Sequence, residues 1–157
     1  MSLTTLKLPH RLFIWLLPLL LISSIGVLAD EFRPALLQIN EREGGWIDVT
    51  WKVPMAGEKV LALTPVLPEF LEPLGPGSGH RTGGVWIVSS VYSSGGRTLN
   101  GATVGVDSLS LIPADVVVQI NLLDGAQHSA ILRSTSSRFT IPEQVTKMQL
   151  AVSYWRM

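Results

Sequence analysis

The sequence predicts an all-β protein, an antiparallel two-sheet β-sandwich of about eight or nine strands, immunoglobulin-like or jelly-roll-like, behind a signal peptide helix. Its clearest element is residues 115–134, where two β-rich runs flank Asp124-Gly125, a dipeptide that favours tight hairpin turns. The first run alternates apolar and polar positions, which is typical of a half-buried strand; its apolar members are Val116, Val118, Ile120 and Leu122. Because such a face needs a second layer to cover it, two packed sheets are expected.

The remaining strands are expected wherever short β-rich runs lie between turn residues. The apolar face of 46–53 repeats the alternation of the central hairpin, and Pro54 is expected to end that strand. The run 59–67 is bounded by prolines, so it is expected to be an edge strand or one that leaves its sheet early. The predicted strands other than the central hairpin are residues 36–43, 46–53, 59–67, 85–92, 102–111 and 138–141.

Residues 1–29 have the features of a secretory signal peptide. Lys7 and Arg11 precede an apolar run at 12–21, and the segment ends in Val27-Leu28-Ala29. A retained anchor helix is the alternative reading, but Pro18 interrupts the apolar stretch and the small terminal residue favours cleavage. We therefore expect an exported domain of residues 30–157, in the periplasm or on the periplasmic face of the bacterial inner membrane.

Composition excludes several classes of function. After Lys7 and Arg11 leave with the leader, ten of the twelve basic residues remain against twelve acidic ones, so no nucleic-acid partner is expected. The chain contains no cysteine, which excludes a disulfide framework and thiolate chemistry.

Residues 68–84 are rich in proline and glycine and are expected to form a long surface loop, with a helical turn near 69–71. Within it, His80 and Arg81 are candidate ligand contacts. The alternative is a flexible connection between the sheets.

The final residues, 143–157, fit both a helical and a strand period, and we favour a closing strand because β-branched and aromatic residues gather there. Aromatic side chains beside a basic residue also suit a membrane interface. The segment therefore also reads as a juxtamembrane tail, whose candidate membrane or partner contacts are Leu150, Val152, Tyr154, Trp155 and Arg156.

Several stretches together resemble the extracytoplasmic N-terminal domain of HupE/UreJ-type bacterial membrane proteins: residues 31–39, 51–54, 109–125 and 154–157. The resemblance implies a β-sandwich outside the inner membrane, attached to a helical, histidine-bearing membrane part in a family linked to nickel or cobalt uptake and to hydrogenase or urease accessory roles. Two features depart from the family. The expected membrane part does not follow Met157, and Asp30 stands where family members commonly have histidine. No functional residue of the family is therefore carried over.

Other chemistries find only weak support. His80 and His128 lack the neighbours that a metal site needs, with Asp30 and Glu31 as weak additional ligands at most. Ser78 lies near His80 but outside any nucleophile elbow. The carboxylates of Glu41 and Glu43 suit edge protection, and a sugar-stacking face could be formed by Trp46, Trp86 and Tyr92.

The expected protein is therefore a non-enzymatic binding or docking domain with no catalytic residue, cofactor or metal site, acting with the membrane or a membrane-embedded partner. The alternative is a free-standing periplasmic module for a small ligand or carbohydrate. An exported hydrolase is a weaker alternative.

Overall fold

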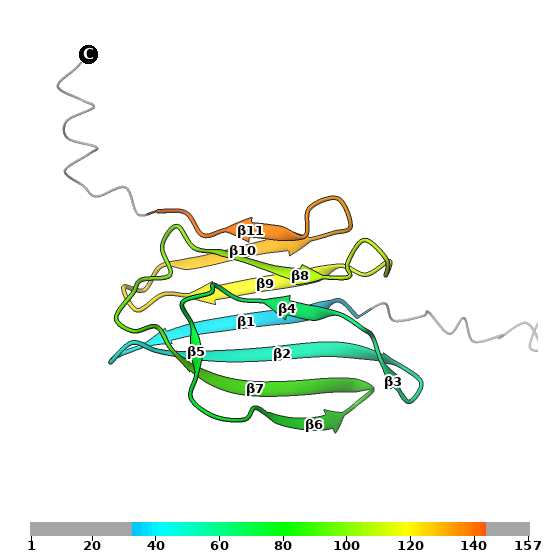
Figure 1. The fold of residues 1–157 in the computed structure, drawn as a ribbon. Coiled ribbons are helices and arrows are strands. Elements are labelled where there is room, and N and C mark those ends of the chain that lie inside the picture. The colour runs from blue at the N-terminus through cyan, green and yellow to red at the C-terminus, as the bar shows by residue number, and fades with distance from the viewer. Residues whose placement is uncertain (1–32, 144–157) are drawn as a thin grey trace, which may run out of the picture. The chain divides into compact units, whose positions relative to one another are not determined.

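A computed structural model describes residues 33–143, and this part of the chain is built from β-strands (Figure 1). Its elements are β1 (Ala35–Arg42), β2 (Trp46–Ala56), β3 (Lys59–Val60), β4 (Thr64–Val66), β5 (Glu72–Pro73), β6 (Ser78–Thr82), β7 (Val85–Ser93), β8 (Thr103–Asp107), β9 (Val116–Asn121), β10 (Gln127–Leu132) and β11 (Arg138–Thr140). The all-β, two-sheet prediction is confirmed, although eleven strands are described where about eight or nine were expected. The predicted leader at 1–29 and residues 144–157 of the predicted closing segment lie outside the described residues.

The larger sheet contains eight strands in the order β10-β9-β1-β2-β7-β5, with β3 also paired to β2 and β6 also paired to β7. The central hairpin forms as predicted, β9 with β10, and the predicted strands 36–43 and 46–53 form a second hairpin, β1 with β2. The hairpins meet where β1 runs parallel to β9, from Ala35 opposite Val116 to Asn40 opposite Asn121. The prediction of a wholly antiparallel fold is therefore wrong at this junction, and the sheet is mixed.

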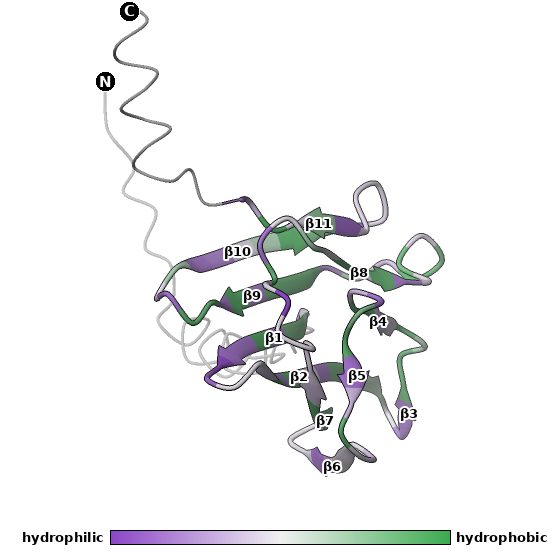
Figure 2. Cartoon of the chain, turned by 60° about the vertical axis from the view of Figure 1, so that its left-hand side comes forward, coloured by the Kyte–Doolittle hydropathy of each residue, from purple (hydrophilic) through white to green (hydrophobic). Residues whose placement is uncertain are grey.

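The smaller sheet has three antiparallel strands in the order β11-β8-β4. Figures 1 and 2 show it lying over one face of the larger sheet, on the side of β10, β9 and β1. The β3–β4 segment explains how the layers are linked, because β3 pairs with β2 in the large sheet and β4 pairs with β8 in the small one. Of the two alternatives expected for the run 59–67, an edge strand or a strand that leaves its sheet early, the structure shows the second.

The core lies between the facing sides of the two sheets. The period-2 alternation places one side chain in two on this inner face, and the predicted apolar positions of β2 and β9 are at most 6% exposed. The small sheet and its flanking loops contribute Leu99, Val104, Val106, Leu109 and Ile141, each at most 1% exposed. Figure 2 shows the same alternation as purple and green segments along the strands.

Two predicted strand ends are wrong for local reasons. Strand β2 continues through Pro54 to Ala56. The amide of Met55 donates to the carbonyl of Gly84 on the β7 side (2.9 Å). The nitrogen of Pro54 therefore points toward the β1 side of the strand, where the pairing with β1 has already ended at Lys52. Because no partner strand lies there, the missing N–H of proline removes no hydrogen bond between strands. Strand β8 stops at Asp107, earlier than predicted, because Ser108 turns the chain at a φ of 65°.

The predicted loop at 68–84 is partly regular. Pro68 and Leu71 form the expected turn, in which the Leu71 amide donates to the Pro68 carbonyl (3.0 Å). The chain then adds β5 and β6 to the edge of β7. The loop prediction is therefore wrong for Ser78–Thr82, because the free edge of β7 supplies the backbone hydrogen bonds that the glycine-rich sequence alone would not predict.

Candidate functional site

The outer face of the large sheet, which points away from the core, presents polar side chains that lie in register across six strands. One row joins positions that pair directly from strand to strand: Ser129, Gln119, Gln38, Thr50, Ser89 and Ser78. A second row beside it contains Gln127, Asn121, Asn40 and Asp48, and ends at Val91. Most of these groups are neutral amides and hydroxyls, which can both donate and accept hydrogen bonds.

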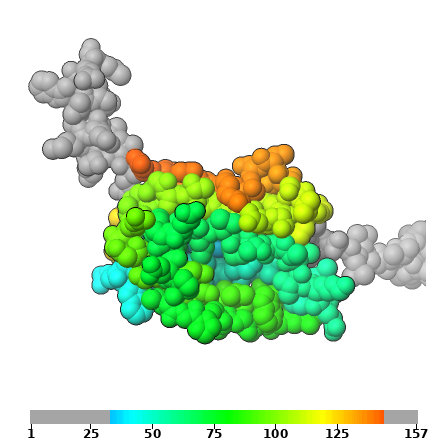
Figure 3. Space-filling view, viewed as in Figure 1, coloured from blue at the N-terminus to red at the C-terminus, as the bar shows by residue number. Residues whose placement is uncertain are grey.

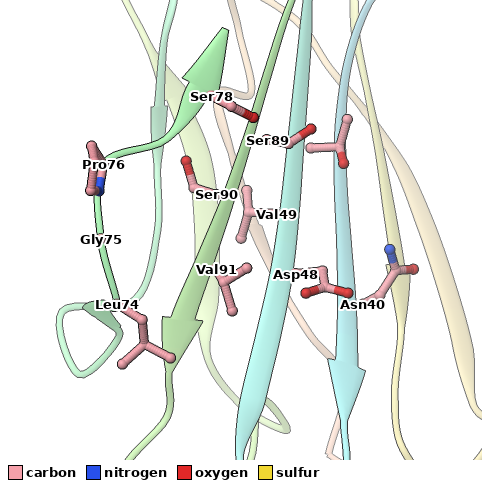
Figure 4. A pocket seen from close by; sticks show the side chains of 11 residues that line it. Asn40, Asp48, Val49, Leu74, Gly75, Pro76, Ser78, Ser89, Ser90 and Val91 are labelled. Atoms are coloured by element: carbon pink, nitrogen blue, oxygen red, sulfur yellow. The ribbon is translucent and has the colours of Figure 1, made fainter.

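A hollow of about 520 Å³ lies on this face over β1, β2 and β7. Figure 4 shows Ser78 and Ser89 on one side of it, and Asp48 beside Asn40 on the other. Leu74, Gly75 and Pro76 close its edge, in the segment that connects β5 to β6. The hollow therefore has a polar floor and an apolar border.

The one carboxylate in the hollow is already balanced by a cation. Nη1 of Arg42 lies 3.0 Å from Oδ2 and 3.2 Å from Oδ1 of Asp48, and the Arg42 side chain is 60% exposed. Next to this pair, Nδ2 of Asn121 donates to Oδ1 of Asn40 at 2.6 Å. These contacts fix the orientation of the polar groups, so the hollow suits recognition of a ligand by hydrogen bonds.

Of the predicted loop contacts, His80 and Arg81 lie on β6, exposed at the edge of the large sheet. His80 is opposite Ile87, and Nη2 of Arg81 is 3.5 Å from the carbonyl oxygen of Gly57. Neither residue lines the hollow, whereas the neighbouring Ser78 does. The predicted contacts Leu150, Val152, Tyr154, Trp155 and Arg156 lie outside the described residues.

The three aromatic residues of the predicted sugar-stacking face do not share one surface. Trp46 is 52% exposed and belongs to the outer positions of β2, while Trp86 and Tyr92 pack against the core from the inner face of β7. The inner pair borders a second, mainly apolar hollow of about 360 Å³ that also includes Trp51 and Leu63. Figure 3 shows the surface hollowed on this side, with blue and cyan residues deep between green and teal ones.

The two histidines within residues 33–143 lie at opposite edges of the large sheet, His80 on β6 and His128 on β10. Within residues 33–143 no group of three histidine or acidic side chains is placed to hold a metal ion. Nε2 of His128 is buried and has no hydrogen-bond partner among the described residues.

The other chemical candidates also separate in the structure. Ser78 and His80 occupy alternate positions of one strand, and no hydrogen bond within 33–143 joins either of them to a carboxylate. Oε2 of Glu41 accepts a hydrogen bond from the Leu123 amide (3.0 Å), which ties the β1 end to the loop after β9. Glu43 is exposed in the turn between β1 and β2.

Sequence reasoning missed the residues that line the outer hollow: Asn40, Asp48, Thr50, Ser89 and Ser90. The sequence does indicate a polar face here, because every second position of 36–43 and 46–53 is mostly polar. Recognising the site also required the register between β1, β2 and β7, which no local pattern gives.

The described residues contain no helix that is long and apolar enough to cross a membrane. Comparison of the chain with family models, with curated proteins and with solved structures finds no match.

Proposed function

We propose that this protein is a non-enzymatic, exported binding domain that works as the extracytoplasmic part of a HupE/UreJ-like membrane system, and that the outer face of the large sheet is its recognition surface. The partner is a membrane-embedded protein or segment on the periplasmic side of the inner membrane. The link to metal uptake rests on the sequence resemblance alone.

The observation that carries this proposal is the outer hollow with its in-register polar rows. A face that only contacts water needs no alignment of amides and hydroxyls across six strands. Here the contact of Asp48 with Arg42 and the contact between Asn40 and Asn121 hold three side chains of the rows in place, and such preorganisation lowers the entropy cost of binding. Neutral groups of this kind recognise a surface by hydrogen bonding rather than by charge.

Site-specific photocrosslinking in living bacteria tests the proposal. A photoreactive amino acid at Thr50, in the hollow, is expected to capture a membrane-embedded protein, identified by mass spectrometry as HupE/UreJ-like. The matched control carries the same group at Leu111, which is 82% exposed and lies outside the strands, in the loop after β8. Equal capture from both positions, or capture of soluble proteins alone, would overturn the proposal.

A free-standing carbohydrate-binding module is the second candidate, favoured by the exposure of Trp46 on the same outer face as the hollow. An exposed indole can stack on a sugar ring while neighbouring amides bind its hydroxyls. Calorimetry with soluble peptidoglycan fragments, comparing the wild type with Trp46→Ala, tests this candidate. Heat of binding that disappears in the variant supports it, and absence of binding by the wild type rejects it.

A further inference from the structure

The small sheet is too narrow to cover the whole inner face of the large sheet. It has three strands against eight, and it lies on the side of β10, β9 and β1 (Figures 1 and 2). Inner side chains of β7 are therefore only partly buried, among them Trp86, Val88 and Tyr92. The hollow of about 360 Å³ lies over this strip, between β4 and the inner faces of β2 and β7. This hollow, lined by Trp51, Trp86 and Tyr92 among others, is the inner groove.

The inner groove is long and shallow. On β7 its lining residues run from Trp86 to Tyr92, and six residues of a strand span about 20 Å. A volume of about 360 Å³ over this length accommodates one side of an extended chain, whereas a compact pocket of that volume would enclose most of its ligand. A chain in the polyproline II conformation rises about 3.1 Å per residue, so about six of its residues match the length of the groove.

The inner groove offers hydrogen-bond donors on aromatic rings and no charge. None of the described residues that line it has a charged side chain, so it suits a neutral occupant. Within residues 33–143, the indole N–H groups of Trp51 and Trp86 and the hydroxyl of Tyr92 have no hydrogen-bond partner. Such groups usually have a partner where the ring is buried, and Trp51 is only 6% exposed. An occupant with accessible carbonyl oxygens would supply these partners.

The Trp86 ring is held in place from the side of β6. A Cβ at Gly79 would lie 2.7 Å from Cζ2 of Trp86, so the missing side chain allows the indole to pack closely against β6. One aromatic wall of the inner groove is therefore formed before any ligand arrives, which lowers the entropy cost of binding.

Two other extended occupants fit these observations less well. The floor of the inner groove is the face of a sheet, whose backbone groups are already paired between β2 and β7. A β-strand laid across it would find no partner for its own backbone. A hydrocarbon chain would cover the aromatic rings but would leave their N–H and O–H donors without an acceptor.

We propose that the inner groove binds a proline-rich segment of another protein in the polyproline II conformation. Proline is neutral and has no N–H, so its burial against an apolar surface leaves no donor unpaired. The carbonyl oxygens of a polyproline II helix make no internal hydrogen bonds, and here they accept from Trp51, Trp86 and Tyr92. Aromatic-lined grooves recognise such segments because the conformation exists before binding and costs little entropy.

Nuclear magnetic resonance of the 15N-labelled full-length protein tests the proposal with decaproline as the probe. The indole N–H signals, assigned with single Trp→Phe variants, report on each ring separately. Decaproline at up to about 1 mM, the range of a weak interaction, is expected to shift the signals of Trp51 and Trp86. Trp46 is the internal control, because it is 52% exposed at an outer position of β2 and its signal should not move.

Two further ligands distinguish the alternatives. A neutral decapeptide of glycine and serine has carbonyl groups but neither proline rings nor a preformed helix, and 2-naphthol is a compact neutral ring compound. Neither is expected to match decaproline. The proposal would be overturned if decaproline left the Trp51 and Trp86 signals in place, if the glycine–serine peptide shifted them equally, or if 2-naphthol alone shifted them.

A pair of variants that each lose one hydroxyl tests the role of Tyr92. Tyr92→Phe keeps the ring and removes the donor, so the affinity for decaproline is expected to fall about fivefold. Thr50→Val, which removes a hydroxyl from the outer hollow, is the matched control and should leave the affinity unchanged. Equal affinities of Tyr92→Phe and the wild type, or an equal loss in Thr50→Val, would overturn the proposal.

Discussion

The side-chain amides of Asn40 and Asn121 are joined by a hydrogen bond of 2.6 Å, although the two residues are 81 positions apart in the chain. They lie directly opposite one another on β1 and β9, where the two hairpins of the large sheet meet in parallel. The bond therefore links the N-terminal and C-terminal hairpins on the outer face, beside the hollow that Asn40 lines.

Asn121→Ala should lower the free energy of unfolding by about 1 kcal/mol, because it leaves the amide of a partly buried Asn40 without its partner. Urea unfolding measures the loss. A double-mutant cycle with Asn40→Ala should give a coupling of about 0.5–1 kcal/mol. Gln119→Ala, an exposed position on the same strand, is the control and should change stability little; a coupling near zero would contradict the expected role of the bond.

Leu37→Ala should destabilise the fold by about 2–5 kcal/mol, because Leu37 is fully buried between the sheets and its truncation leaves a cavity. Leu111→Ala removes the same atoms from a side chain that is 82% exposed and should cost less than about 0.5 kcal/mol. The midpoints of chemical unfolding for the two variants measure the difference. Similar losses would show that Leu37 is not a core residue.

The central hairpin could be predicted because its signals are local. Asp124-Gly125 supplies the turn, with Gly125 at a φ of 88°, and alternation alone places Val116 and Ile120 in the core. The parallel pairing of β1 with β9 could not be predicted in this way. A strand that pairs in parallel has the same alternation as one that pairs antiparallel, and the contact is non-local.

The same limit applies to the candidate site. Thr50 and Ser89 are ordinary polar positions in their own strands, and they become neighbours only through the register of β2 with β7. In the segment 68–84, the glycine content predicts a loop. At Gly79 the missing side chain instead makes room for the ring of Trp86, so the residue belongs to a packed strand.

Gly105→Ala should destabilise the small sheet by about 1–3 kcal/mol, through overpacking against β11. A Cβ at this position would lie 2.5 Å from the Ser137 carbonyl oxygen, which is backbone and cannot move aside easily. Thermal unfolding measures the loss. Adding Arg138→Ala removes the other close neighbour of position 105. A double variant with the stability of the wild type would therefore show that the new methyl group clashes with the Arg138 side chain and not with the Ser137 backbone.

Gly79→Ala and Gly75→Ala form a matched pair that tests the packing of β6 on β7. A Cβ at position 79 would lie 2.7 Å from Cζ2 of Trp86, whereas one at position 75 would meet nothing within 4 Å. Gly79→Ala should therefore cost about 1–3 kcal/mol in urea unfolding, and Gly75→Ala should be neutral or slightly stabilising because it reduces the entropy of the unfolded chain. Introducing Trp86→Phe into Gly79→Ala should recover part of the loss, since the smaller ring vacates the space that the new methyl group needs. Equal losses of unfolding free energy in the two glycine variants would mean that the Trp86 ring does not pack against Gly79. Strand β6, at the edge of the sheet beside the outer hollow, would then be stabilised by its backbone pairing with β7 alone.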